Sequence, residues 1–256
     1  MNAPEKIDIC GVSVHNCDMR QAVDFVESLI RSKQCHYVVT PNIDHIVKLQ
    51  TDTEFKSAYD AASLVLPDGM PLIWAGQFLG TPFKSKVSGS DLFEEMSGVA
   101  AKKGLSVYLL GAAPGVADRA AQTLKARFPG LRVAGIYSPP LGFERDGEEI
   151  RRINERIRTA APDILFLGLG TPKQEKWMYR HKDSLGPLVG ILVGASFDFT
   201  AGVVRRAPRW MQQTGLEWLW RLGLEPRRLW KRYLVEDPAF FWLLLRQKFS
   251  KKRPVR

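Results

Sequence analysis

The sequence has few cysteines and lacks an apolar run long enough to cross a bilayer. Its cysteines, Cys10, Cys17 and Cys35, are odd in number and gathered near the N-terminus, so they do not form a disulfide framework. The longest purely apolar run in the C-terminal part covers residues 239–245, far short of the ~20 residues that a spanning helix needs. The opening Met-Asn-Ala-Pro-Glu-Lys lacks the apolar stretch of a signal peptide. We therefore expect a cytoplasmic protein that, where it meets a membrane, lies on its surface.

Motifs that mark common nucleotide and metal chemistry are also absent. The nearest approach to Gly-x-Gly-x-x-Gly, residues 168–173, lacks the third glycine and gives no support to a nicotinamide cofactor. The sequence has no Walker motif, no zinc-ligand spacing and no Gly-x-Ser-x-Gly elbow. It has no Asp-x-Asp either, so the usual metal-dependent way of holding a nucleotide diphosphate has no candidate. We expect no cofactor and no metal, with negative charge stabilised by Arg, Lys and helix ends.

The net charge is confined to the last fifth of the chain. Residues 1–200 contain 23 Lys+Arg and 23 Asp+Glu, whereas residues 201–256 contain 14 and 4 and so carry the whole net charge of +10. Five of the seven tryptophans also lie in this part. Cations interleaved with Trp and Leu suit an anionic membrane surface, and nucleic acid is the alternative partner. We divide the chain into a core, residues 1–200, and a basic helical appendage that binds membrane, residues 201–256.

The core alternates short apolar strands with amphipathic helices. This order predicts an α/β fold with a Rossmann-like, mostly parallel sheet and helices on both of its faces. The first strands form a hairpin that turns at Gly11. Helix starts are predicted at a capping box, Thr51-Asp-Thr-Glu54, and at Ser90, and a charged helix is predicted over residues 147–160.

Ligands of such sheets bind beyond the carboxyl ends of the strands, so the loops there carry the candidate residues. Asp68 follows an apolar strand and is placed to act as a general base, although Pro-Asp-Gly is also a favoured turn. Thr40 and Asn42 follow another strand and are placed to bind a sugar or a base. Asn42 also suits the cap of the next helix, and we interpret the nearby His45 as structural.

Gln174 illustrates how local and functional roles overlap. Thr171-Pro-Lys-Gln174 fits a capping box with proline at the first helical position, which would explain these residues without any ligand. Gly168-Leu-Gly170, just before it, lets backbone approach a ligand, and a helix N-terminus attracts anionic oxygen. Both roles fit the sequence.

The loops together resemble the WecG/TagA/CpsF family of bacterial glycosyltransferases. The resemblance extends over residues 7–232, and its motifs follow one another in the family's order. They are Thr40-Pro-Asn42, Pro67-Asp-Gly69, Val87-Ser-Gly-Ser-Asp91, Gly111-Ala-Ala-Pro-Gly115, Gly168-Leu-Gly-Thr-Pro-Lys-Gln-Glu175, and Arg206-Ala-Pro with Gly215-Leu-Glu-Trp-Leu-Trp-Arg221.

The resemblance implies a metal-independent, inverting enzyme on the inner face of the cell membrane. Such enzymes pass a sugar (N-acetylmannosamine, its uronic acid or glucose) from a UDP-sugar to a monosaccharide on undecaprenyl diphosphate, making a β-linkage in cell-surface polysaccharide synthesis. Asp68 then resembles the catalytic base. The implied substrate-binding residues are Thr40, Asn42, Lys86, Gln174, Arg206, Arg221, Arg228 and Arg232, with Arg221 and Arg228 nearest the diphosphate.

Lys86 departs from the family, which usually has Arg at this position. Lysine keeps the charge but loses the bidentate geometry that suits phosphate. The expected partners are the UDP-sugar, the lipid-linked acceptor and an anionic membrane surface, without nucleic acid; a homo-oligomer is compatible with this interpretation. Two alternatives from other classes are a nucleic-acid-binding protein that uses the basic tail and a nicotinamide-dependent oxidoreductase.

Overall fold

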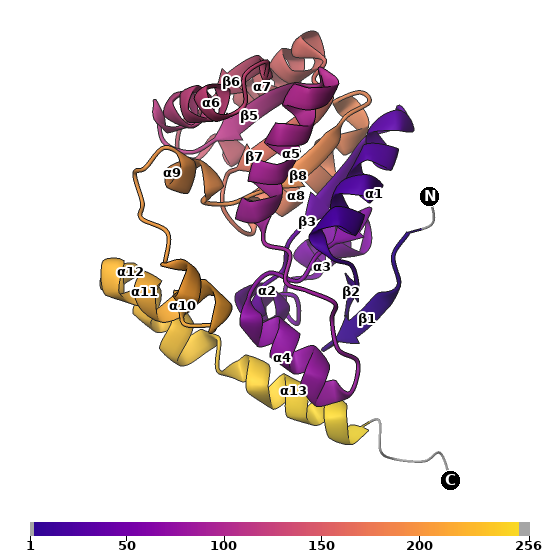
Figure 1. Ribbon diagram of the computed structural model, residues 1–256, viewed down its shortest axis with the longest axis vertical. Coiled ribbons are helices and arrows are strands. Elements are labelled where there is room, and N and C mark those ends of the chain that lie inside the picture. Colours follow the sequence, from indigo (N-terminus) through magenta and orange to yellow (C-terminus); the bar gives the residue numbers. More distant parts are fainter. Residues whose placement is uncertain (1–2, 251–256) are drawn as a thin grey trace.

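The computed structural model describes residues 3–250 and contains one large sheet, one hairpin and helices around them (Figure 1). The six strands of the large sheet pair in parallel in the order β4-β3-β8-β7-β5-β6. This confirms the predicted α/β class with a parallel sheet. The strands of the sheet are β3 (His36–Val39), β4 (Leu64–Val65), β5 (Ser106–Gly111), β6 (Arg132–Tyr137), β7 (Ile164–Gly168) and β8 (Val189–Leu192).

Helices cover both faces of the sheet because successive residues of each strand point to opposite sides. On β3, for example, Val38 packs into the core on one face while Tyr37 and Val39 pack into the core on the other. The first face is covered by α1 (Met19–Arg31), α5 (Gly89–Lys103), α6 (Val116–Arg127) and α9 (Ser196–Thr200), and the second by α2 (Ile43–Lys48), α3 (Thr53–Asp60), α7 (Gly147–Ala160) and α8 (Lys173–His181).

The predicted hairpin is present as a separate two-stranded antiparallel sheet. Its strands, β1 (Lys6–Ile9) and β2 (Val12–His15), are joined at Cys10 and Gly11, and both joining residues have positive φ. The hairpin packs beside α4 (Met70–Leu79), the helix that follows the short strand β4.

The C-terminal part of the chain is helical and lies below the sheet in Figure 1. Its elements are α10 (Arg209–Gln213), α11 (Glu217–Leu224), α12 (Pro226–Lys231), a π-helical turn η3 (Arg232–Glu236) and α13 (Ala239–Ser250). Four of its tryptophans, at positions 210, 218, 230 and 242, are 39–69% exposed. Over residues 3–250, no helix is both long enough and apolar enough to cross a membrane.

Two predicted helix starts are wrong by one or two residues. Asp52, rather than Thr51, caps α3 by accepting a hydrogen bond from the Phe55 N–H. Ser88, rather than Ser90, caps α5 by accepting one from the Asp91 N–H. In both cases a neighbouring polar residue occupies the extended backbone position that a cap requires.

Candidate active site

A pocket of about 740 Å³ lies where the carboxyl ends of the strands face the C-terminal helices. Its walls come from the segments after β3, β4, β7 and β8, from Ser88 and Ser90 at the start of α5, and from residues 206–241. The structure brings eight of the nine predicted site residues to this pocket: Thr40, Asn42, Asp68, Gln174, Arg206, Arg221, Arg228 and Arg232. Lys86 is not among the lining residues described, although its charge acts on Asp68.

Asp68 follows β4 and is held by backbone at both sides. Its N–H donates to the Pro41 carbonyl at 2.9 Å, and Gly69 opens α4 with φ of +98°, a conformation that favours glycine. The carboxylate accepts one long hydrogen bond, 3.4 Å from the Gly89 N–H, and otherwise lines the pocket. The Pro-Asp-Gly segment therefore makes the turn and also presents its carboxylate to the cavity.

The surroundings of Asp68 raise its pKa to about 6. Burial is the main cause, and the negative charge of Glu217 acts in the same direction. Lys86, the Gly89 N–H and Arg221 oppose this shift because they favour the ionised form. The carboxylate is therefore a stronger base than an ordinary aspartate, and it is ionised above about pH 6.

Thr40 and Asn42 link the end of β3 to α2 and to the C-terminal part. Asn42 caps α2, because its Oδ1 accepts from the His45 N–H at 3.3 Å. The same oxygen accepts from Arg232 Nη2 at 3.2 Å. Thr40 is buried against α5, where a Cβ on Gly89 would lie 2.9 Å from the Thr40 hydroxyl. Asn42 is therefore both the predicted cap and a contact to the tail.

The predicted capping box at Thr171 is wrong. Helix α8 begins at Lys173 without a side-chain cap, and Pro172 precedes it rather than opening it. The Thr171 hydroxyl instead donates to Glu175 Oε1 at 3.0 Å and lies 2.9 Å from His45 Nε2. The hydroxyl thus contacts one side chain of its own helix and one that is 126 residues away in sequence, and it caps no backbone N–H.

Gln174 is buried and holds two strand-end loops together. Its Nε2 donates to Glu175 Oε1 at 2.9 Å, and its Oε1 accepts from the Gly194 N–H at 3.3 Å. Burial raises the pKa of Glu175 to about 7, partly offset by the hydrogen bonds from Gln174 and Thr171. Burial also lowers the pKa of His45 to about 3, so this imidazole is neutral and bonds Tyr59 at 2.7 Å. These contacts agree with a structural role for His45.

Arg206 and Arg232 are held by carboxylates of the core. Arg206 Nη1 donates to Asp91 at 2.7 Å, and its Nη2 donates to the Ser88 hydroxyl at 3.3 Å. Arg232 contacts Asp44 at 3.5 Å in addition to Asn42. Both arginines therefore connect the C-terminal part to the core.

Arg221 and Arg228 are placed differently. The Arg221 guanidinium lies 5.3 Å from the centre of the Phe199 ring, and no ion pair to it is found among the residues described. Arg228 makes a bidentate pair with Glu225 of its own segment, at 2.6 and 2.8 Å. Neither is held by a core carboxylate. Arg221 is available to an anionic ligand in the pocket, whereas Arg228 would exchange its pair with Glu225 for such a ligand.

Sequence reasoning missed several residues of the site. Ser88, Lys48, Glu217 and Trp218 line the pocket, as does Asp237, which is 2% exposed. Burial raises the pKa of Asp237 to about 6, although nearby Arg232 opposes the shift. Ser88, Glu217 and Trp218 stand within family motifs, and this was their only signal in the sequence, whereas Lys48 and Asp237 gave none. Within residues 3–250, no three His, Cys, Asp or Glu side chains are grouped so as to hold a metal ion.

The sequence model of the glycosyl transferase WecG/TagA/CpsF family matches residues 7–254, almost the whole chain. The chain belongs to this family. Two similar proteins are N-acetylglucosaminyldiphosphoundecaprenol N-acetyl-β-D-mannosaminyltransferases of Bacillus subtilis strain 168, 31% identical over 238 residues, and of Staphylococcus aureus strain NCTC 8325, 27% identical over 250 residues. The matches cover 93% and 97% of this chain, and 90% and 95% of the relatives.

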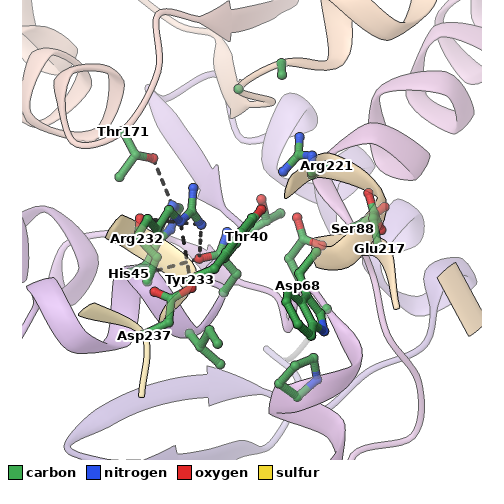
Figure 2. Close-up of a pocket in the computed structure, with 18 of the residues that line it drawn as sticks. Thr40, His45, Asp68, Ser88, Thr171, Glu217, Arg221, Arg232, Tyr233 and Asp237 are labelled. Atoms are coloured by element: carbon green, nitrogen blue, oxygen red, sulfur yellow. Dashed lines mark hydrogen bonds and ion pairs between the residues drawn. The ribbon is translucent and has the colours of Figure 1, made fainter. Parts of the chain in front are cut away.

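Membership of the WecG/TagA/CpsF family makes the protein a glycosyltransferase and leaves the nucleic-acid-binding and oxidoreductase alternatives without support. Figure 2 shows how this glycosyltransferase arranges its pocket. Asp68, Arg221, Ser88 and Glu217 lie at one side, and Thr171, His45, Arg232 and Asp237 at the other, with Thr40 between them. The cavity thus has the Asp68 carboxylate on one side and a hydrogen-bonded polar wall on the other.

Proposed function

We propose that the protein transfers a hexose-type sugar from a UDP-sugar to a monosaccharide on polyprenyl diphosphate. Family membership supports the transfer, and the names of the relatives support the acceptor, N-acetylglucosaminyldiphosphoundecaprenol, and a β-linked product. Those names also favour N-acetylmannosamine as the donor sugar over its uronic acid or glucose. The product belongs to the synthesis of a cell-surface polysaccharide.

The single observation that carries the mechanism is the position of Asp68. Its carboxylate lines the pocket, its single described hydrogen bond is long, and its pKa is raised to about 6. A base of this kind is ionised at neutral pH and still accepts a proton from an attacking hydroxyl. In the proposed reaction Asp68 takes that proton while the acceptor oxygen attacks the anomeric carbon from the face opposite UDP. The linkage is inverted as UDP leaves.

The departing UDP carries negative charge, and we assign its stabilisation to arginine rather than to metal. Arg221 and Arg228 lie at the pocket without a core carboxylate partner, and Arg is suited to paired phosphate oxygens. Lys86 acts on the proposed base rather than on UDP, because its charge favours the ionised form of Asp68. Thr40, Asn42 and Gln174 complete the sugar-nucleotide pocket, and Arg206 and Arg232 brace it. Turnover undiminished by a chelator is the expected result.

The C-terminal part is proposed to hold the enzyme on the inner face of the cell membrane. Its exposed tryptophans and its excess of cations suit an anionic leaflet, which attracts each cation by about 1 kcal/mol near the surface. In this proposal residues 1–200 form the catalytic core, and residues 201–256 bind the membrane and close the pocket.

The direct test replaces the proposed base. Asp68→Asn removes the proton acceptor with little change in shape, so transfer falls by roughly 100-fold or more, the range of general base catalysis. Binding of the UDP-sugar, measured by calorimetry, is expected to stay close to that of the unaltered protein. Asp60→Asn, the same change at an exposed carboxylate of α3 paired with Lys56, is the control and keeps full activity. Full activity of Asp68→Asn would remove the assignment.

A further inference from the structure

Helix α4 carries an apolar stripe that begins inside the pocket and ends at the surface. Met70, Trp74 and Phe78 are four residues apart and so lie on one face of the helix. Met70 and Trp74 line the pocket, two and six residues beyond Asp68. Trp74 is 46% exposed and Phe78 44% exposed. The stripe therefore leads outward from the proposed base.

Helix α13 carries a second stripe of the same kind. Phe241, Leu245 and Phe249 have the same spacing, and their exposed fractions are 57%, 41% and 61%. Phe241 lines the pocket. The adjacent face of α13 is used differently, because Phe240 and Leu244 are buried in the core. Packing against the core therefore does not account for the exposed stripe.

The two helices that carry these stripes run side by side in the same direction. Figure 1 shows α13 alongside α4, and the two helices are in contact. Lys248 near the end of α13 donates to the Phe78 carbonyl at 2.5 Å and lies 5.2 Å from the Phe78 ring centre. Met70 and Phe241 thus mark the pocket end, and Phe78 and Lys248 the outer end. At 1.5 Å per residue, each stripe spans about 12 Å.

The pocket end of this surface is held in place by the tail. Gly215, which has φ of +72°, packs directly against the Trp74 ring, so that a Cβ there would collide with it. Gly215 begins the segment that carries Trp218 and Arg221 into the pocket. The position of Trp74 is therefore fixed by the same segment that brings a cation to the site.

We propose that the α4–α13 surface, made by these six apolar side chains, binds the first isoprene units of the acceptor. This inference rests on the proposed function, in which a sugar hydroxyl reaches Asp68 while the attached diphosphate and lipid chain leave the pocket. A chain leaving the pocket needs an apolar path, and this surface is continuous with the pocket wall at Met70, Trp74 and Phe241. The core helix α4 thereby shares lipid recognition with the tail.

The test compares two water-soluble acceptors in the absence of membranes and detergent. Both carry the same sugar diphosphate, one esterified to a short isoprenoid chain and the other to a methyl group. The unaltered protein is expected to favour the isoprenoid acceptor by roughly tenfold in kcat/KM, about the effect of burying one large apolar group. The double variant Phe78→Ser, Leu245→Ser is expected to lower this preference severalfold. Trp210→Ser, at a 58% exposed position on α10 outside the stripes, is the matched control and keeps the preference.

A second measurement does not depend on turnover. Calorimetric binding of farnesyl diphosphate is expected to weaken severalfold in the double variant, with an unchanged melting temperature showing that the fold is intact. Absence of transfer to both acceptors would contradict the proposed function, while weakened farnesyl diphosphate binding would still support the isoprene site. An unaltered protein without preference between the acceptors would overturn the inference. A double variant that keeps the preference but floats poorly with anionic vesicles would also overturn it, because the surface would then contact the bilayer.

Discussion

At the scale of single residues, opposing influences set the chemistry of Asp68. Burial and Glu217 raise its pKa, while Lys86, the Gly89 N–H and Arg221 limit the rise, and the result is a pKa of about 6. A general base works best when its pKa lies near the working pH, since it is then ionised and still basic. The neighbours of Asp68 are therefore as much a part of the proposed mechanism as the carboxylate.

The pH dependence of the reaction follows from this balance. Because the base must be ionised, kcat/KM is expected to rise with pH through an apparent pKa of about 6 and to level off above it. Glu217→Gln removes a charge that raises the pKa, so it should shift this limb to lower pH, and Lys86→Gln should shift it to higher pH. Initial rates at low substrate concentration between pH 5 and 8 measure this rise of kcat/KM with pH. A flat profile, or shifts of the opposite sign, would contradict the role of Asp68.

Two arginines of the pocket are expected to differ in what they stabilise. Arg206→Ala breaks a hydrogen-bonded pair with Asp91, whose pKa lies below its usual range because hydrogen bonds from Arg206 and Ser88 outweigh the effect of burial. Thermal unfolding should show a loss of about 1 kcal/mol, because the charge-assisted hydrogen bond is lost between side chains that are 25% and 35% exposed. Arg221→Ala removes a cation without a core partner, so it should lower kcat/KM on the order of tenfold or more with little change in stability.

The reverse result would change the assignment of both residues. If Arg221→Ala mainly lowered the melting temperature and Arg206→Ala mainly lowered kcat/KM, Arg206 would be the ligand of the diphosphate and Arg221 the brace. Both measurements are made on the same protein preparations, so stability and activity are compared directly.

At the scale of elements, the strands and helices that depend on local sequence pattern were predictable. Apolar runs such as residues 106–111 became strands of the parallel sheet, and the charged helix over residues 147–160 was confirmed with the same bounds. Strand ends were predictable for the same reason, and they placed Asp68, Thr40 and Gln174 at one edge. The caps were less well predicted because several polar residues near a helix start suit the same role.

What the sequence could not predict depends on distant partners. Thr171 bonds His45 and Glu175 rather than the backbone of its own helix, and nothing within residues 168–175 indicates this choice. Arg206 pairs with Asp91 from 115 residues away. Asp237 enters the pocket only because the tail folds back onto α2. Such contacts depend on tertiary packing, which local patterns do not encode.

The C-terminal helices provide a prediction at this scale. Truncation after Gly202 removes Arg221 and Arg228 together with the exposed tryptophans, so it should abolish binding to anionic vesicles and most transfer. Vesicle flotation and a transfer assay measure the two losses, and circular dichroism checks that the parallel sheet remains folded. Undiminished transfer by the truncated protein would contradict the closing of the pocket by the tail.

At the scale of the whole molecule, the net positive charge lies in the C-terminal part of the chain. The core residues are neutral overall, and the cations are concentrated in the part that lies across the carboxyl end of the sheet. The pocket lies between the two parts and takes residues from both. An enzyme that reaches a membrane-bound acceptor through its cationic side would meet the substrate at this pocket.

The most direct measurement is the transfer reaction itself, with a chelator present. The protein is incubated with UDP-N-acetylmannosamine and a polyprenyl-diphosphate-linked N-acetylglucosamine, and the product is analysed by mass spectrometry and by NMR of the new linkage. UDP-glucose and UDP-N-acetylmannosaminuronic acid are tested in parallel. The account predicts a β-linked disaccharide on the lipid with at least one of these donors, and its loss with Asp68→Asn. Absence of product with all three donors, or an undiminished product from Asp68→Asn, would contradict it.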